Sequence, residues 1–280
     1  MIEQTAPESP CRPIVSVIVP TVRLDDDFIA AVRSLQVQTL HAIEIIVVLD
    51  GVTGEPAVGV ARDWKTIQRD ARIRVVRHAK RRGTPAALNT GVTASTAELI
   101  GRLDADDLAE PDRFRRQAAE FDRLPNLVLL GSSARLIDEN GDQIGSYTTP
   151  ATGVDRILLR HNAFVHSSVV MRRDALQFVG GYDERCNRMQ DYELWLRLAQ
   201  VGAVGNLSDP LVSYRVHPGM HSRNTRAFGP AAAAIRASRL GLARHLGRSR
   251  VTQQAENALW TLAQVARSHR LRRPRYLKST

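Results

Sequence analysis

Three carboxylates are crowded together at the end of an apolar run. Asp104, Asp106 and Asp107 follow directly after segment 99–103, and a helical pattern begins at Pro111. Because Asp104 and Asp106 are two positions apart in an extended segment, their side chains lie on one face, within reach of a shared cation. Carboxylate oxygens suit Mg²⁺ or Mn²⁺, which proteins hold with one or two carboxylates plus substrate phosphates. The alternative is that these are solvated loop acids, one of which caps the helix.

A further acid, Asp50, stands at the end of another apolar segment, 43–49. In parallel α/β sheets, ligands bind beyond the carboxyl ends of the strands, and Asp50 and Asp104 both follow such an end. The alternative for Asp50 is a turn residue in an Asp-Gly pair with Gly51. The positions of the two acids predict a ligand site at one edge of a sheet.

Short β-branched segments alternate with helical patterns and must position these acids. Strands are expected at residues 14–19, 43–49, 73–76, 98–103, 127–137 and 167–171, and helices after Asp25 and at residues 85–92, 111–124, 190–199 and 225–270. Strands separated by helices favour right-handed crossovers. The sequence predicts an α/β fold with a mostly parallel, twisted sheet flanked by helices, and a C-terminal helical extension.

The net charge of +10 is unevenly distributed along the 280 residues. Residues 222–280 contain 12 Arg and 1 Lys against one acid, Glu256, so the preceding part of the chain is close to neutral. No run approaches the roughly 18 apolar residues of a membrane span, and the polar N-terminus predicts no signal peptide. The two cysteines, Cys11 and Cys186, have neither disulfide-framework nor zinc-site spacing. We therefore expect two free thiols and a near-neutral body with a cationic extension.

Five sequence blocks indicate a family. They are "VSVIVPT" (15–21), "EIIVVLDG" (44–51), "RRGTPAALNTGV" (81–92), "LIGRLDADDLAEPDRF" (99–114) and "MQDYELWLRL" (189–198). In this order and spacing the chain resembles the family 2 inverting glycosyltransferases over about residues 14–220. The resemblance implies the GT-A fold, in which a nucleotide-binding half merges with an acceptor-binding half. It also implies transfer of a sugar from a nucleotide diphosphate sugar, most often UDP-linked, with inversion at the anomeric carbon.

The resemblance implies roles for the matching positions on the donor side. The residues implied in donor binding are Pro20, Thr21, Asp50, Gly83, Asn89 and Asp104. Asp50 would accept a hydrogen bond from the uracil N3–H. Asp106 would ligate Mg²⁺ or Mn²⁺ directly, Asp104 would contact the ribose or the hydrated metal, and His217 would reach the metal or the diphosphate. Asp107 is expected to help cap the following helix or to face water.

Asp191 is the candidate general base that removes the proton of the acceptor hydroxyl. It begins a predicted helix, where the helix dipole favours an ionised carboxylate. Trp195, one turn on, would form an apolar wall for the acceptor sugar. The alternatives are a simple N-terminal helix acid for Asp191, core packing for Trp195 and a structural role for His217.

The chain departs from the common family pattern at several positions. Leu49 replaces the first acid of the usual Asp-Asp-Gly-Ser, and Gln190 replaces the Glu of the usual Glu-Asp pair. The base and the metal ligand keep their residue types. The nucleotide base beyond a preference for UDP, the sugar and the acceptor stay open.

Four regions are expected along the chain. They are a flexible N-terminus (1–12), a nucleotide-sugar-binding α/β half (13–124), an acceptor-binding half (125–221) and a basic helical extension (222–280). The acceptor would be a saccharide or a lipid-linked molecule, in the synthesis of a cell-envelope polysaccharide or glycolipid. We expect a cytoplasmic location. Peripheral attachment to the inner face of the cell membrane stays open as an addition to it.

The basic extension admits three interpretations. It lies on anionic lipid headgroups, it binds nucleic acid through phosphates, or it packs on the body as a helical cap. Packing is favoured for residues 240–265 and a peripheral membrane role for residues 267–280.

Two other classes of function stay open beside the transferase. One is a degenerate GT-A protein that binds nucleotide without turnover, and the other is a nucleic-acid-binding protein that uses the basic extension. A sugar-phosphate nucleotidyltransferase would need a glycine-rich phosphate loop after the first strand, and "PTVRLDDDF" (20–28) contains no glycine.

Overall fold

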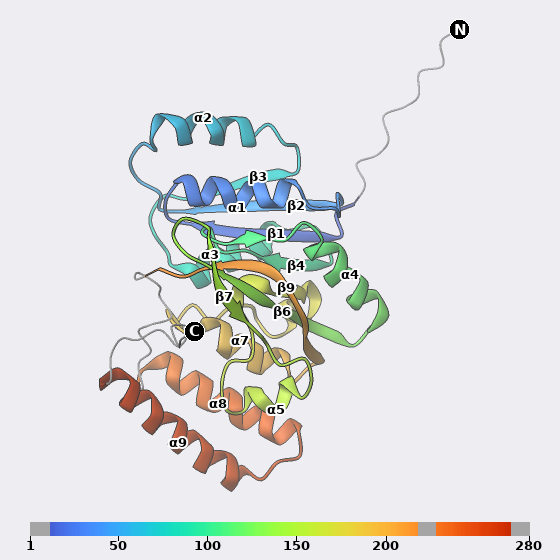
Figure 1. Cartoon of the computed structure of the whole chain (residues 1–280). Coiled ribbons are helices and arrows are strands. Elements are labelled where there is room, and N and C mark those ends of the chain that lie inside the picture. Colours follow the sequence, from blue (N-terminus) through green and yellow to red (C-terminus); the bar gives the residue numbers. More distant parts are fainter. Residues whose placement is uncertain (1–11, 218–227, 270–280) are drawn as a thin grey trace.

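A parallel four-stranded arrangement forms the N-terminal part of the protein (Figure 1). The computed structural model describes residues 12–217 and 228–269. The four strands are β1 (Val15–Thr21), β2 (Ile43–Asp50), β3 (Ile73–His78) and β4 (Leu99–Arg102). Strands β1, β2 and β4 are mostly apolar and buried along nearly their whole length because both of their faces are covered.

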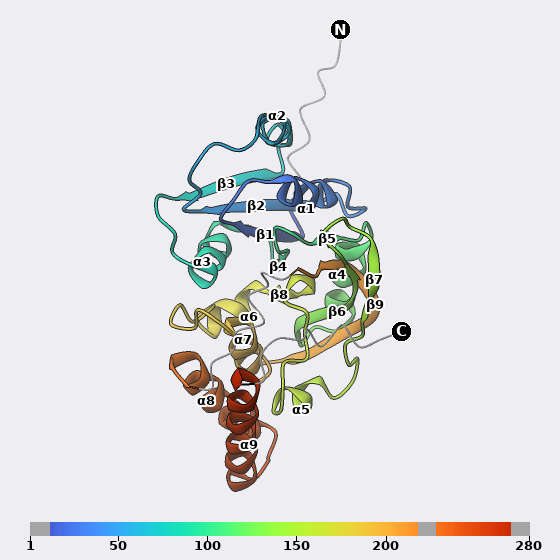
Figure 2. The same cartoon turned by 60° about the vertical axis from the view of Figure 1, so that its left-hand side comes forward.

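Helices cover both faces of this part of the sheet, and Figure 2 shows α1 and α3 on opposite sides of it. The helices are α1 (Asp26–Gln36), α2 (Val58–Ile67) and α3 (Thr84–Ala94). Asp25 caps α1 by accepting a 2.9 Å hydrogen bond from the Phe28 amide. Alternate residues of β1 enter different cores: Val17 packs with the side of α1, and Ile18 with the side of α3. The two-sided burial fixes the strand register.

The second half of the chain extends the same sheet. Its elements are β5 (Leu108–Ala109), α4 (Arg113–Arg123), β6 (Leu127–Ile137), β7 (Gln143–Tyr147), α5 (Val154–Leu158), a 3₁₀ turn (His166–Ser168), β8 (Val170–Arg172), α6 (Arg173–Phe178), α7 (Gln190–Leu198) and β9 (Ala203–Arg215). The strand order is β3-β2-β1-β4-β8-β6-β9-β5, with β7 paired to β6. Strand β8 is antiparallel to both β4 and β6, and β9 is parallel to β6.

The predicted fold class is confirmed, and the structure adds detail to it. The parallel arrangement holds for β1 to β4, whereas the remainder of the sheet is mixed. The prediction of a strand from residue 167 was wrong at its start, because residues 166–168 form a 3₁₀ turn and the strand begins at Val170. The sequence pattern did not predict β5, β7 or β9.

Two antiparallel helices, α8 (Pro230–His245) and α9 (Arg250–His269), follow the sheet. In Figures 1 and 2 they lie at the end of the molecule furthest from β3 and α2. The turn between them contains Gly247, whose φ of +66° is readily adopted only by glycine. Within residues 12–217 and 228–269, no helix combines the length and apolarity needed to cross a membrane.

Candidate active site

Three neighbouring strands end at one edge of the sheet and bring the predicted acids together. Thr21 pairs with Leu49 on β2, and Ile18 pairs with Arg102 on β4. Asp50 and Asp104 therefore flank the end of β1, where Thr21 and its neighbour Pro20 lie. The predicted ligand edge is thus formed from three separate sequence blocks.

Asp50 is a buried carboxylate with three internal hydrogen-bond donors. It accepts from the backbone amides of Arg82 and Gly83, both at 2.8 Å, and from Nδ1 of His78 at 2.8 Å. Burial alone would raise the pKa of Asp50, but these hydrogen bonds outweigh it and the pKa is lowered. Asp50 is thus held ionised, and it fixes the loop that leads into α3. A carboxylate accepts about four hydrogen bonds, so the predicted uracil contact would use its remaining site.

The same loop lies directly against the turn that follows Asp50. Gly51 has a φ of +67°, and a Cβ placed on it would come within 2.2 Å of the Arg81 amide nitrogen. Only glycine permits this approach of two backbones. Asp50 and Gly51 therefore act together: the first residue anchors the loop at residues 82–83, and the second provides room for it.

Asp104 is paired with a buried cation that the sequence prediction did not include. Arg102, with 2% of its side chain exposed, donates to both carboxylate oxygens of Asp104, one of them at 2.6 Å. Burial alone would lower the pKa of Arg102, and the charge of Asp104 outweighs this and raises it. The Asp104 amide also donates to the Ser167 hydroxyl at 2.7 Å. Asp104 is thus fixed from two sides.

Asp106 lies beside His217, which comes from the far end of the chain. The distance from Nε2 of His217 to Oδ2 of Asp106 is 3.2 Å, and both side chains are partly exposed. Burial and the charge of Asp104 raise the pKa of Asp106. A carboxylate and an imidazole face one another at the surface of the predicted site.

Arg215 positions this pair. Its guanidinium donates to the carbonyl of Asp106 at 2.9 Å, and its amide donates to the Asp107 carboxylate at 2.8 Å. Asp107 is 1% exposed, and its burial raises its pKa well above the usual value. The expectation that Asp107 caps a helix or faces water was therefore wrong. Its carboxylate instead attaches β9 to the acidic loop, two residues before His217.

Asp191 lies in the first turn of α7 and is half-buried. Nδ2 of Asn162 donates to its carboxylate at 2.8 Å. Removal from water raises the pKa of Asp191, whereas the hydrogen bonds from Tyr192 and Asn162 and the charge of Arg102 oppose this rise. A carboxylate with a raised pKa accepts a proton more readily than an ordinary surface acid.

The prediction that Trp195 contacts the acceptor was wrong. Trp195 is 0% exposed and lies in the core below Asp191. Its ring packs against Phe164 at 5.8 Å, His166 at 5.7 Å and Tyr182 at 6.5 Å between centroids. Since all of its surface is in contact with protein, it supports the start of α7 rather than forming a wall for a sugar.

Asn89 holds the loop that lies across α3. Its amide group donates to the Tyr182 carbonyl and accepts from the Tyr182 amide, both at 2.9 Å. Its Nδ2 also contacts Glu184 at 3.3 Å. Its predicted donor-binding role would require it to leave these partners, so the structure favours a positioning role. Gly83 keeps its place beside Asp50, with a φ of +96°.

The residues present fit a divalent cation in part. Among the described residues, no group of three or more His, Cys, Asp or Glu side chains is arranged to hold a metal ion. Asp106 and His217 supply two donors, and Asp104 is occupied by Arg102. This number of protein ligands suits an ion that is also held by a substrate diphosphate and water. The predicted three-residue ligand set is thus reduced to a pair that a phosphorylated ligand would complete.

Several site residues were missed in the sequence. Arg102 stands two positions before Asp104. It was missed because an arginine in an otherwise apolar strand pattern indicates the end of the strand and not a site residue. Arg215 stands two positions before His217, and its spacing to that histidine was the available signal. His78 and Asn162 gave no signal, because each becomes important only through a partner 28 or 29 residues away.

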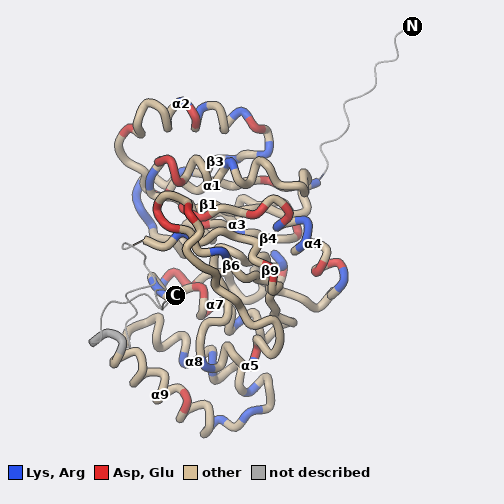
Figure 3. The backbone as a smooth tube through the Cα atoms, in the orientation of Figure 1, with Lys and Arg blue, Asp and Glu red and all other residues tan. Residues whose placement is uncertain are grey.

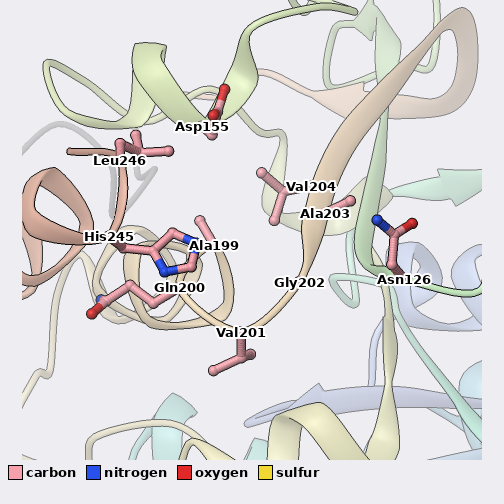
Figure 4. Close-up of a pocket in the computed structure, with 10 residues that line it drawn as sticks. All are labelled: Asn126, Asp155, Ala199, Gln200, Val201, Gly202, Ala203, Val204, His245 and Leu246. Carbon is pink, nitrogen blue, oxygen red and sulfur yellow. The ribbon is translucent and has the colours of Figure 1, made fainter.

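Two hollows elsewhere share no residue with this edge of the sheet. One has a volume of about 440 Å³ and lies between α5, the start of β9 and the end of α8; Figure 4 shows Asp155 and His245 lining it. The other has a volume of about 530 Å³ and lies beside the turn between α8 and α9. The candidate site is therefore defined by the strand ends and not by these hollows.

Comparisons with known proteins agree with this geometry. Residues 16–180 match the family model described as glycosyl transferase family 2. The amylovoran biosynthesis glycosyltransferase AmsE of Erwinia amylovora is 33% identical over 185 residues, which cover 65% of this chain and 68% of AmsE. The O-antigen biosynthesis glycosyltransferase WbnJ of Escherichia coli is 28% identical over 220 residues, which cover 77% of this chain and 84% of WbnJ.

A similar fold occurs in a solved structure. TarS of S. aureus in complex with UDP-GlcNAc superposes with a TM-score of 0.65 at 16% sequence identity, covering 88% of this chain and 71% of that one. At this identity the likeness concerns the arrangement of the sheet and helices.

Proposed function

The chain belongs to glycosyl transferase family 2 and is a glycosyltransferase, and we propose that it transfers a sugar from a UDP-linked donor to an acceptor hydroxyl with inversion at the anomeric carbon. The observation that carries the proposal is the position of Arg102. Its guanidinium is paired with Asp104 on the donor side, and its charge also acts on Asp191, the proposed base. The charge of one buried arginine thus acts on the acids of both halves of the reaction.

In this proposal the donor lies across the ends of β1, β2 and β4. The loop fixed by Asp50 borders the nucleotide, and Asp106 and His217 are the residues that would hold Mg²⁺ or Mn²⁺. When bound, this ion would stabilise the charge that develops on the leaving diphosphate. Arg102 keeps the Asp104 carboxylate in one orientation, so its position is fixed before the ligand binds.

On the acceptor side, Asp191 removes the hydroxyl proton as the oxygen attacks the anomeric carbon. Burial raises the pKa of Asp191 and thus increases its basicity, and hydrogen bonds from Asn162 and the Tyr192 amide hold the carboxylate in place. Attack from the face opposite the diphosphate inverts the anomeric configuration. Arg102, which favours the ionised form of Asp191, keeps the base ready before the acceptor binds.

The names of the relatives support a class of acceptor. AmsE and WbnJ are named for amylovoran and O-antigen biosynthesis, so we propose a saccharide or lipid-linked acceptor in a cell-envelope polysaccharide or glycolipid, made at the cytoplasmic face of the membrane. The UDP-GlcNAc complex of TarS supports UDP as the nucleotide.

A ligand panel tests the donor. We expect UDP-linked sugars to raise the unfolding temperature in the presence of Mn²⁺, and GDP-, dTDP- and CMP-linked sugars to have a smaller effect. The anomeric configuration of the product, measured by NMR, tests inversion. Stabilisation by another nucleotide in preference to UDP, or a retained configuration, would contradict the proposal, and binding without any product would identify a degenerate transferase.

The Asn162–Asp191 hydrogen bond gives a pH prediction. Because this bond favours the ionised carboxylate, Asn162→Ala should raise the pKa of Asp191 further. The base works only when deprotonated, so the acid limb of the profile of kcat/KM against pH should move to higher pH in the variant. Asn140→Ala, in an exposed turn, serves as the control and should leave the limb in place. If the acid limb of the profile does not move in Asn162→Ala, the ionisation that controls the rate is not that of Asp191.

A further inference from the structure

Helix α9 shows an unusual distribution of side chains. The face packed against the protein carries Gln253, Asn257, Trp260 and Gln264, which are 1–8% exposed. The outward face carries Val251, Leu259 and Leu262, which are 75%, 66% and 64% exposed. Three alanines are exposed on the same face: Ala255, Ala258 and Ala266. At 3.6 residues per turn these six positions form one continuous strip, which we call the α9 apolar face.

Hydrogen bonds fix the rotation of α9 that leaves this face outward. Gln253 donates to the Leu159 carbonyl at the end of α5 at 3.3 Å, and Asn257 donates to the Arg236 carbonyl of α8 at 3.2 Å. Turning the apolar face inward would break both bonds and deprive the Leu159 and Arg236 carbonyls of these donors. Leu259 and Leu262 are therefore exposed because these hydrogen bonds fix the orientation of α9.

Cations lie beside the N-terminal end of the α9 apolar face, and the sequence that follows α9 is basic as well. Figure 3 shows arginines at the turn between α8 and α9. Next to this turn, the hollow of about 530 Å³ is lined by Arg156, Arg160 and Arg248. At the other end, the sequence continues past the described residues with four Arg, one Lys and no acid in residues 270–280. Glu256 is the only acid in residues 230–280, and it is paired with Arg160 and Arg248.

We propose that the α9 apolar face is a docking surface for an anionic lipid bilayer. Exposed apolar side chains beside arginines suit a membrane interface, in which the apolar groups enter the acyl boundary and the cations lie among the headgroups. Nucleic acid would instead require the arginines themselves to occupy the outward face. Residues 240–265 pack on the body as expected, and α9 does so through the face that carries Gln253, Asn257 and Trp260, which leaves the α9 apolar face outward. The predicted membrane role of residues 267–280 concerns side chains outside the described part of the chain.

Helices α9 and α8 would then connect the bilayer to α7, the helix that carries the proposed base. Helix α8 lies between α9 and α7, and the Ser238 hydroxyl donates to Glu193 of α7 at 2.9 Å. Asp191 is on the same helix as Glu193. Docking through α9 would therefore hold the acceptor side of the molecule at a defined distance from a lipid surface.

Vesicle co-sedimentation of the full chain tests the proposal. We expect binding to vesicles of phosphatidylcholine with phosphatidylglycerol, and weaker binding to phosphatidylcholine alone or at high salt. The double variant Leu259→Glu/Leu262→Glu should reduce the partition coefficient at least about tenfold. The matched control, Val58→Glu/Phe178→Glu, changes residues that are 88% and 81% exposed on α2 and α6, and it should bind as the natural chain does. Unfolding temperatures of both variants confirm that they fold.

Three results would overturn the proposal. One is that the α9 double variant binds vesicles as strongly as the natural chain does. This result would overturn the proposal even if deletion of residues 270–280 alone abolished binding, because the contact would then lie in those residues and not on α9. Another is the absence of binding to anionic vesicles. The third is a dimer that the double variant converts to a monomer, which would assign the face to a second copy of the chain. None of these results depends on the donor or the base, so the proposed function is tested separately.

Discussion

Replacing Asp191 with Asn is expected to reduce transfer by about 10²- to 10⁴-fold, the usual contribution of a general base. Asn keeps the size of the side chain and an oxygen that accepts from Asn162, but it cannot take up the acceptor proton. Binding of the donor should be unchanged, because Asp191 lies on the acceptor side. Initial rates at saturating donor, with donor affinity measured by calorimetry, separate the two effects. Unchanged turnover would refute the base assignment.

The same substitution should also stabilise the protein at neutral pH. The folded-state pKa of Asp191 is raised, so keeping it ionised costs stability at every pH above its unfolded value near 3.8. Asn removes this cost, and 1 kcal/mol corresponds to an increase in Tm of about 2–4 °C for a domain near this size. Asp183→Asn is the control with the opposite sign, because the pKa of Asp183 is lowered by Arg185. Loss of activity together with a higher Tm would indicate a residue kept for function and not for folding.

Replacing Asp106 with Ala is expected to abolish the dependence of donor binding on Mn²⁺ and to lower transfer by at least about 10²-fold. The variant leaves His217 as a single donor, since Asp104 is held by Arg102. In the natural chain, a UDP-sugar at 100 times its Kd should stabilise the fold by about 2.7 kcal/mol. Thermal unfolding with and without Mn²⁺ measures both quantities, and the metal-dependent part should vanish in the variant.

Asp142→Ala provides the charge-matched control for Asp106→Ala. Asp142 is an exposed acid in the turn between β6 and β7 and lies outside the strand-end cluster. Its removal should leave the metal response intact. If Asp106→Ala kept a full metal response, the ion would have to be held elsewhere, and the pair of Asp106 and His217 would lose its proposed role.

Local sequence was sufficient to predict the parallel part of the sheet. In β2, eight buried and mostly apolar positions end at Asp50, the first residue of an Asp-Gly pair, so the strand signal and the turn signal are adjacent in the sequence. The βαβ order then placed Asp50 and Asp104 at the same edge, because parallel strands direct their carboxyl ends the same way. Strand β9 was missed because Gly205, Asn206 and Pro210 interrupt its pattern, and its register against β6 shifts accordingly.

What the sequence by itself determined about this protein is its family, its α/β class and the sheet edge at which the acids gather. The tertiary structure alone decided the state of each acid: Asp104 paired with Arg102, Asp107 buried under Arg215 and Asp191 held by Asn162. It also decided that Trp195 is core and that α9 turns its apolar side outward. The physical reason is that burial and hydrogen bonding depend on partners from distant segments, whereas strand and helix patterns arise from neighbours in the chain.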